Sequence, residues 1–140
     1  MTLEVYAAAQ ALVPAPPERV FALVTDWPRH REWMVATSAW QAGEGRVEAF
    51  TGVGRLGFLD VMTIRRWQPP HVVEMEHVGR LVRGAGVIRV QEHPGGSRVI
   101  WAERLHPPLG VVGWLLWPLA RPVVNALARL SLRRLARLVA

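Results

Sequence analysis

The chain contains no cysteine and no lysine among its 140 residues. Without cysteine it can form no disulfide, no thiolate nucleophile and no cysteine-bound metal site. All 17 basic residues are arginine, and they outnumber the 11 acidic residues, which gives a formal net charge of +6. The arginines are spread from Arg19 to Arg137, and only a short cluster near the C-terminus gathers several of them. No aromatic residues interleave with that cluster, so we expect a solvated helix face and no nucleic-acid partner.

Sequence motifs for metal, nucleotide and serine chemistry are also missing. The histidines, at positions 30, 71, 77, 93 and 106, have no metal-ligand spacing and no HExxH motif, so we expect no metal. Ser38, Ser97 and Ser131 do not lie in the sequence context of a nucleophile elbow. The glycines of residues 52–57 lie between two predicted strands, with no helix after them to receive a phosphate. We therefore expect no cofactor.

Leader and membrane-spanning segments are not apparent either. The N-terminus lacks a basic stretch followed by a continuous apolar run. The most apolar run, Leu109 to Ala120, is interrupted by a proline and is shorter than the roughly 20 residues that cross a bilayer. These observations favour a cytoplasmic protein. Peripheral membrane contact through Val111 to Leu119, which includes Trp114 and Trp117, stays open, as does the oligomeric state.

What the chain does contain is typical of one globular domain over residues 1–140, because 51% of its residues are hydrophobic. Residues 3–13 are rich in alanine and valine and predict a first strand that ends before Pro14. Ala15-Pro16-Pro17-Glu18 opens a helix, because proline and an acidic residue both suit a first turn. Asp26-Trp27-Pro28 predicts the start of a second short helix, with Asp26 at its N-cap. Together the two helices would form a lid.

From residue 36 the pattern alternates with period two and is broken by regular turn signals, which predicts an antiparallel meander of six strands. The predicted strands cover residues 37–42, 46–53, 58–67, 71–78, 82–92 and 98–105. A C-terminal helix follows, with strong periodicity from Val123 and an uncertain start near Pro118 and Pro122. Its predicted apolar face carries Ser131 at its centre and is otherwise formed by Val123, Val124, Leu127, Leu130, Leu135 and Leu138.

This order of elements, a strand, two short helices, six strands and a long helix, resembles the START-like (SRPBCC) superfamily. Residues 15–27, APPERVFALVTDW, are similar to the opening of that superfamily, and WQPP at residues 67–70 and WAERL at 101–105 resemble its polyketide cyclase/dehydrase and lipid-transport branch. The resemblance implies an α+β helix-grip (START/Bet v 1-like) fold. In that fold a seven-stranded antiparallel sheet wraps around the C-terminal helix. It implies less about function, because the superfamily includes carriers, receptors and enzymes.

Strand alternation indicates which side chains face the space between sheet and helix. Three ionisable side chains fall on that face: Asp60, His77 and Glu103. They are candidate general acids and bases, or else simply partners of nearby arginines such as Arg55 and Arg66. Gly84 and Gly86 lie between the strands of His77 and Glu103 and would open space. The predicted cavity lining is Phe58, Asp60, Met62, Met75, His77, Gly84, Gly86, Ile88, Trp101, Glu103, Leu127 and Ser131.

Three functions follow as hypotheses. The first is a binding protein that holds a hydrophobic or aromatic small molecule, such as a lipid or polyketide, in this cavity. The second is a polyketide cyclase, aromatase or dehydratase that uses the inward histidine and carboxylates as general acid and base. The third is a membrane-surface or protein-interaction module. The sequence does not establish whether the protein is an enzyme.

Overall fold

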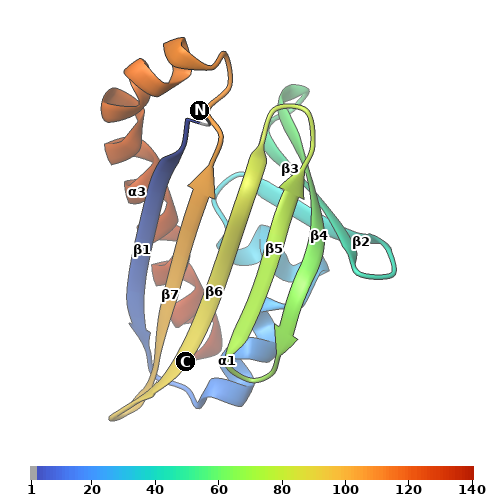
Figure 1. The fold of residues 1–140 in the computed structure, drawn as a ribbon. Helices are drawn as coiled ribbons and strands as arrows, with labels where there is room; N and C mark the ends of the chain where they lie inside the picture. Colours follow the sequence, from blue (N-terminus) through green and yellow to red (C-terminus); the bar gives the residue numbers. More distant parts are fainter. Residues whose placement is uncertain (1–2) are drawn as a thin grey trace.

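Seven antiparallel strands form one curved sheet that wraps around a long C-terminal helix (Figure 1). The structure is a computed structural model that describes residues 3–140, so Met1 and Thr2, where the expected domain and any leader would begin, lie outside the described residues. The order of strands in the sheet is β1-β7-β6-β5-β4-β3-β2. The strands are β1 (Val5–Val13), β2 (Thr37–Gly43), β3 (Arg46–Val53), β4 (Leu56–Gln68), β5 (Val72–Val78), β6 (Arg83–His93) and β7 (Gly96–Leu105).

The helix-grip prediction is confirmed. Strands β2 to β7 form a meander because each is joined to the next by a short turn, and β1 then pairs with β7 from Val5–Leu105 to Val13–Ser97. Predicted and observed strand ends differ by no more than two residues. The agreement follows from the glycine and proline turn signals, which end the alternating pattern at nearly every strand boundary.

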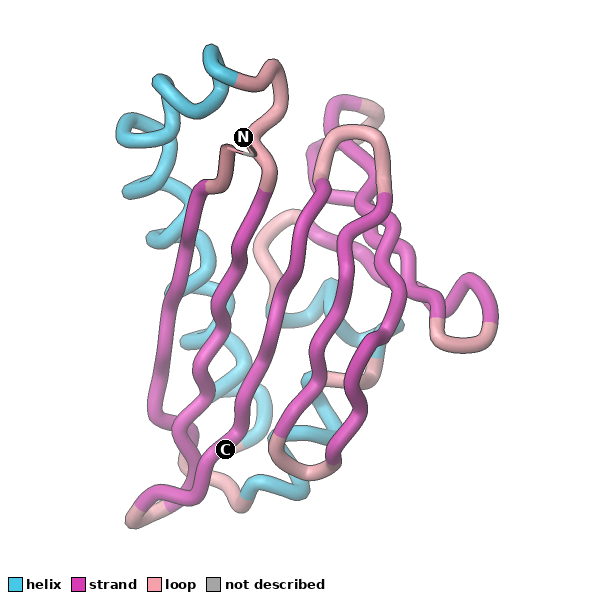
Figure 2. The backbone as a smooth tube through the Cα atoms, viewed as in Figure 1, coloured by secondary structure: helices cyan, strands magenta, loops and turns pink. Residues whose placement is uncertain are grey.

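Short helices close one end of the sheet, as Figure 2 shows in cyan. They are α1 (Pro17–Val24), the 3-10 turn η1 (Trp27–Arg29) and α2 (His30–Trp33). Phe21 of α1 packs edge-on against Trp67 of β4, with ring centroids 5.3 Å apart. Trp33 is fully buried. Asp26 occupies the N-cap position as predicted, but its side chain makes no capping hydrogen bond. These helices therefore belong to the packed core of the fold.

The C-terminal helix α3 (Val111–Val139) is longer than the periodicity predicted, and it includes both Pro118 and Pro122. Its buried face also differs from the prediction. Leu135 and Ser131 are buried as expected, but the other buried residues are Leu132 and Val139, whereas Val123, Leu127 and Leu130 are exposed. Two adjacent apolar stripes run along this helix, and periodicity alone cannot distinguish which one meets the sheet. The buried residues of α3 therefore all lie in its last turns, from Ser131 to Val139.

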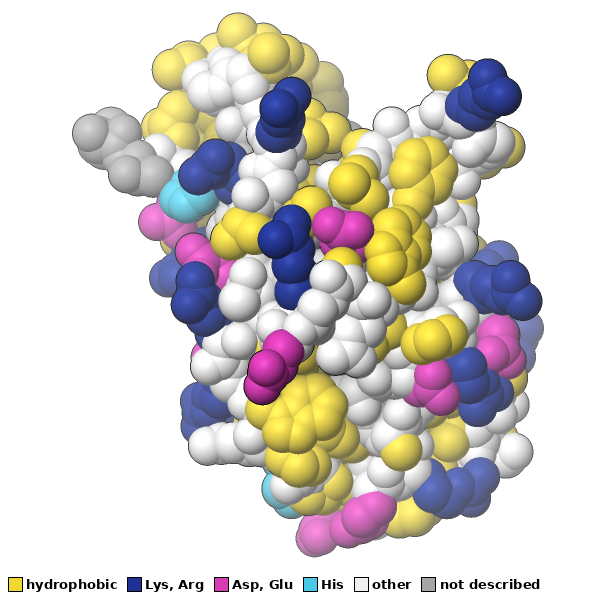
Figure 3. All heavy atoms as spheres, turned by 90° about the vertical axis from the view of Figure 1, so that its right-hand side faces the viewer, with side chains coloured by type: hydrophobic (Ala, Val, Ile, Leu, Met, Phe, Trp, Pro, Cys, Tyr) yellow, Lys and Arg dark blue, Asp and Glu magenta, His cyan; other side chains and the backbone are white. Residues whose placement is uncertain are grey.

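The first half of α3 projects beyond the sheet and is apolar on its surface (Figures 1 and 3). Within residues 3–140, α3 is the one helix that is long and apolar enough to cross a membrane by length and composition, and none of its most apolar 18-residue window is buried. The sequence-based judgement that the apolar run is too short was therefore wrong about its length, because the prolines do not end the helix. Trp117 Nε1 donates to the Tyr6 carbonyl at 3.2 Å, which ties this half of α3 to β1.

Candidate functional site

A cavity of about 420 Å³ lies between the concave face of the sheet and α3. Its wall is mainly apolar and is formed by all seven strands, by η1 and α2, and by the part of α3 from Trp117 to Ser131. Every residue of the predicted lining except Gly84 borders it. These are Phe58, Asp60, Met62, Met75, His77, Gly86, Ile88, Trp101 and Glu103 of the strands, and Leu127 and Ser131 of α3. A cavity of this size and polarity is typical of a site for a small molecule.

Three charged side chains meet at one wall of the cavity. His77 of β5 donates from Nδ1 to Asp60 of β4, with the two carboxylate oxygens 2.8 and 3.0 Å away. Its Nε2 donates to Glu103 Oε2 of β7 at 2.8 Å. The Trp101 indole N–H donates to the other oxygen of Glu103 at 2.9 Å. Both ring nitrogens of His77 are thus occupied by carboxylates.

This arrangement makes His77 an imidazolium at neutral pH. Burial of the ring disfavours the charged form, but the hydrogen bonds and charges of Asp60 and Glu103 outweigh it and raise the pKa of His77 to about 10. Two carboxylates and one imidazolium leave one net negative charge in the wall. No arginine is among the described residues that line the cavity, so nothing there offsets that charge.

The glycines of β6 explain how side chains two strands apart can touch. His77 pairs with Gly84, and Gly86 pairs with Glu103, so β6 runs between the two partners. Strands two apart in a sheet are separated by about 10 Å, and a side chain on β6 would lie between them. A Cβ at Gly86 would come within 2.5 Å of Glu103 Oε2. Gly86 therefore makes room for the carboxylate of Glu103.

The expected open space at Gly84 and Gly86 is corrected accordingly. At Gly86 that space holds the Glu103 carboxylate. Gly84 does not line the cavity, and a Cβ there would overlap the carbonyl oxygen of Arg104. Its φ of +136° is also a conformation that favours glycine. The backbone conformation and the close approach of Arg104 therefore require glycine at position 84. Its placement in the cavity lining was wrong, because strand alternation does not reveal a local backbone distortion.

The arginines considered as partners for the inward acids lie elsewhere. Arg66 faces outward and pairs with Glu74 at 3.4 Å, and Arg55 lies in the turn between β3 and β4. The charges that Asp60 and Glu103 meet come from His77 instead. No group of three or more histidine, aspartate or glutamate side chains in residues 3–140 is arranged to hold a metal ion.

Several residues outside the predicted lining also border the cavity. His30 of α2 is buried, and because its Nε2 lies 2.6 Å from the Val24 carbonyl oxygen, that nitrogen carries the proton. Burial lowers the pKa of His30, so the ring is neutral. Thr37 and Thr51 share a hydrogen bond of 3.0 Å across β2 and β3. The side chains of Thr37 and Thr51 face inward, as do those of Ala39 and Ala49 on the same two strands. The weak alternation of residues 37–42 did not reveal this inward face in the sequence. Other lining residues outside that prediction include Trp27, Met34, Trp117, Val124 and Ala128.

Ser131 has a structural role at the cavity floor. Its hydroxyl accepts a hydrogen bond from the Val35 backbone N–H at 3.0 Å and donates to the Leu127 carbonyl at 2.9 Å. It therefore joins α3 to the segment between α2 and β2. Because both its donor and one acceptor position are occupied, Ser131 has little capacity left for a ligand.

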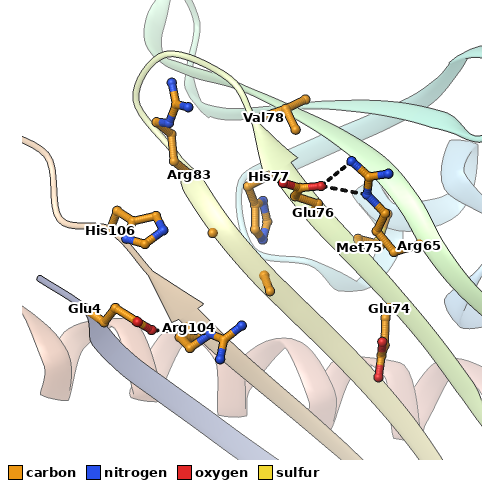
Figure 4. Close-up of a pocket in the computed structure, with 12 residues that line it drawn as sticks. Glu4, Arg65, Glu74, Met75, Glu76, His77, Val78, Arg83, Arg104 and His106 are labelled. Atoms are coloured by element: carbon orange, nitrogen blue, oxygen red, sulfur yellow. Dashed lines mark hydrogen bonds and ion pairs between the residues drawn. The ribbon is translucent and has the colours of Figure 1, made fainter. Parts of the chain in front are cut away.

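A second hollow lies on the outer face of the sheet and has a different character (Figure 4). It is bordered by Glu4, which precedes β1, and by charged side chains of β4, β5, β6 and β7. Four of these charges form two ion pairs, Arg65 with Glu76 and Arg104 with Glu4 at 3.3 Å. Solvated ion pairs of this kind contribute little and leave few free groups for a ligand. We therefore place the candidate site in the inner cavity.

The sheet, the gripped helix and the cavity between them define a helix-grip protein with an internal polar cluster. The chain matches the family described as polyketide cyclase / dehydrase and lipid transport over residues 5–140. It belongs to that family, as the resemblance suggested. A search of the curated proteins finds no match to the sequence.

Solved structures share the fold at low sequence identity. TTHA0849 from Thermus thermophilus superposes with a TM-score of 0.76 and 19% identity, covering 96% of this chain and 97% of that one. CV1439 from Chromobacterium violaceum gives a TM-score of 0.74 and 14% identity, covering 96% of both chains. The di-domain ARO/CYC StfQ from the steffimycin biosynthetic pathway gives 0.75 and 12%, covering 96% of this chain and 50% of StfQ. These similarities establish the fold.

Proposed function

We propose that the protein binds a neutral, hydrophobic small molecule that carries a hydroxyl or similar hydrogen-bond donor. The observation that supports this is the cavity of about 420 Å³, whose wall is apolar apart from a few polar groups headed by the Asp60–His77–Glu103 cluster. Burying apolar ligand surface would contribute about 25 cal/mol per Å². The family description and the ARO/CYC neighbours also support a hydrophobic or polyketide-related ligand.

The carboxylates would orient such a ligand, and Asp60 is the better placed. The side chains of Asp60 and Glu103 are 15% and 18% exposed, whereas that of His77 is 6% exposed. Both oxygens of Glu103 already accept from separate donors, Trp101 and His77. The two oxygens of Asp60 share a single N–H of His77. Asp60 therefore keeps the larger free capacity to accept a hydrogen bond from a ligand.

Filling the cavity is expected to abolish binding. Ala128 of α3 lines the cavity and is partly buried, so Ala128→Phe would place a ring in the ligand space. Ala126 is exposed on the same helix, so Ala126→Phe is the matched control. With pyrenemethanol as a fluorescent probe, we expect Ala128→Phe to weaken Kd by about tenfold or more, which corresponds to about 1.4 kcal/mol of lost contacts. Ala126→Phe should match the wild type.

The thermal midpoints of both variants show whether either has lost its fold. Native mass spectrometry of the wild-type protein with a panel of apolar alcohols and hydroxylated polycyclic compounds extends the test to other ligand shapes. Binding that is equal in the two phenylalanine variants would place the ligand outside this cavity. If no member of the panel binds the wild type, the proposed function is wrong.

A second candidate function is proton transfer on a polyketide-like substrate. The observation that favours it is a pair of carboxylates held at an apolar wall. His77 is poorly suited as a general base, because carboxylates occupy both of its nitrogens and it is already protonated at neutral pH. Asp60 is the group that could accept a proton from a bound substrate.

If this second function holds, Asp60→Asn should lower kcat for a poly-β-ketone substrate by about 100-fold or more, the usual contribution of a general acid or base. Glu74→Gln, on the outer face of the neighbouring strand β5, is the control and should leave turnover unchanged. Product formation followed by chromatography measures both. Full turnover in Asp60→Asn would reject this role.

A further inference from the structure

One end of the molecule carries an apolar rim around the cavity mouth. We define the rim as residues 53–59 between and within β3 and β4, residues 78–83 between β5 and β6, and residues 109–124 of α3 and its approach. All three segments lie at the same end of the fold (Figure 1). Phe58, Val82 and Trp117, one from each segment, line the same cavity, so the rim surrounds its opening.

The rim exposes large apolar side chains from all three segments. Leu56 is 82% exposed at the tip of the β3–β4 hairpin and Leu119 is 77% exposed on α3, and Leu81 is also exposed. Figure 3 shows apolar atoms gathered on the two projections at this end, with a hollow between them. Large apolar side chains exposed together at one end of a domain mark a site of interaction.

The charges in the rim are all of one sign. Its four ionisable side chains are Arg55, Arg80, Arg83 and Arg121, and the rim contains no aspartate or glutamate. All four arginines are exposed. Beyond Glu103 the chain has no acidic residue at all. The rim thus combines exposed leucines with positive charge that no acidic residue of the rim offsets. This combination is complementary to a surface with an anionic outer layer and an apolar interior.

We propose that this rim docks the protein on an anionic lipid bilayer. The leucines of the hairpin tip and of α3 would enter the boundary between headgroups and acyl chains, and the arginines would meet lipid phosphates. Trp114, which is exposed on α3, is suited to the same depth. The helix lies on the bilayer and does not cross it, because its last turns are gripped by the sheet and Trp117 is bonded to β1.

Docking through the rim would also determine how a ligand reaches the cavity. A rim seated on lipid would open the cavity directly toward the acyl chains, so an apolar ligand could enter without crossing water. The docking proposal itself does not depend on which ligand binds, because it rests on the exposed leucines and arginines.

Sedimentation with vesicles tests the proposal on the full chain. We expect the wild type to bind vesicles of phosphatidylcholine with phosphatidylglycerol at low salt, and to bind vesicles of phosphatidylcholine alone much less. Arg55→Glu with Arg80→Glu should lower the partition coefficient by about tenfold or more. Leu56→Asp should lower it comparably. All three positions are exposed, so the variants should fold.

Matched controls lie at the opposite end of the molecule. Arg133→Glu with Arg137→Glu changes the net charge equally on the last turns of α3, and Leu12→Asp changes an exposed leucine near the end of β1. Both should bind like the wild type. The proposal is overturned if the wild type fails to bind anionic vesicles, or if rim and control variants lose binding equally. It is also overturned if light scattering shows a dimer that Leu56→Asp dissociates while vesicle binding is absent.

Discussion

Replacing His77 with alanine is expected to lower the free energy of unfolding by about 3–5 kcal/mol, the usual cost of removing one partner from a buried ion cluster. The imidazolium bonds both Asp60 and Glu103. Without it, two carboxylates would remain in a largely buried wall with no neighbouring cation among the described cavity residues. Urea denaturation at pH 7 measures the loss. His93→Ala, which removes only a bond to the adjacent Pro94 carbonyl, should cost less than about 0.5 kcal/mol.

The pH dependence distinguishes lost charge from lost packing. The pKa of His77 rises from 6.5 to about 10 on folding, so the folded state binds the proton more tightly. The contribution of the imidazolium is therefore complete below pH 6.5 and is lost as the pH rises toward 10. Wild-type stability should decline across that window, at up to about 1.4 kcal/mol per pH unit, and the His77→Ala variant should lack this decline.

A double variant gives a further control on the same cluster. In His77→Ala with Glu103→Gln one of the two unpaired charges is gone, so it should be more stable than His77→Ala alone. A loss below about 1 kcal/mol in His77→Ala, with an unchanged pH profile, would mean that His77 does not hold a stabilising charge between the two acids.

The second large effect concerns the charge of the ligand. Because the cavity wall carries one net negative charge and no arginine among its described residues, a ligand carboxylate would meet repulsion and find no cation. At about 4 Å and an effective dielectric constant near 20, like charges repel by about 4 kcal/mol. We therefore expect pyrenecarboxylate to bind about 1,000-fold more weakly than pyrenemethanol, its neutral counterpart of similar size, in fluorescence titrations at about pH 7.5.

Removing the charges should remove the discrimination. Asp60→Asn with Glu103→Gln keeps the shapes of both side chains, and we expect the ratio of the two dissociation constants to fall to about tenfold or less. Glu74→Gln with Glu76→Gln, on the outer side of the same sheet, should leave the ratio unchanged. Equal affinity of the wild type for the two probes would refute the charge argument. Absence of binding by both would instead count against the cavity as a ligand site.

Strand alternation was informative about the site because side chains in a strand change face at every residue. Asp60, His77 and Glu103 could therefore be assigned to the inner face from the sequence. The contacts of these three side chains with one another could not be predicted from the sequence. They depend on the register of strands β4 to β7 and on the glycines of β6. The choice of His77 over Arg55 or Arg66 as the partner of the acids also depends on that register.

The helical part of the sequence was less informative. Leu132 and Leu135 are fully buried while the equally apolar Leu127 and Leu130 are exposed, and their composition gives no reason to separate them. Which stripe is buried depends on where α3 leaves the sheet. Similarly, strand alternation assigns Gly84 and Gly86 to the same face of β6. Gly84 is needed for the backbone conformation, whereas Gly86 makes room for the carboxylate of Glu103.

The sequence by itself determined the order of elements, the strand boundaries and the inward face of the sheet, because turn residues and period-two alternation act locally. It also determined that the rim segments carry arginine and no acid. The tertiary structure alone decided that His77 bonds both carboxylates, which stripe of α3 is gripped, and that the three rim segments surround one cavity. These properties depend on contacts between residues far apart in the chain, and their free energies arise from the packing of the whole sheet against α3.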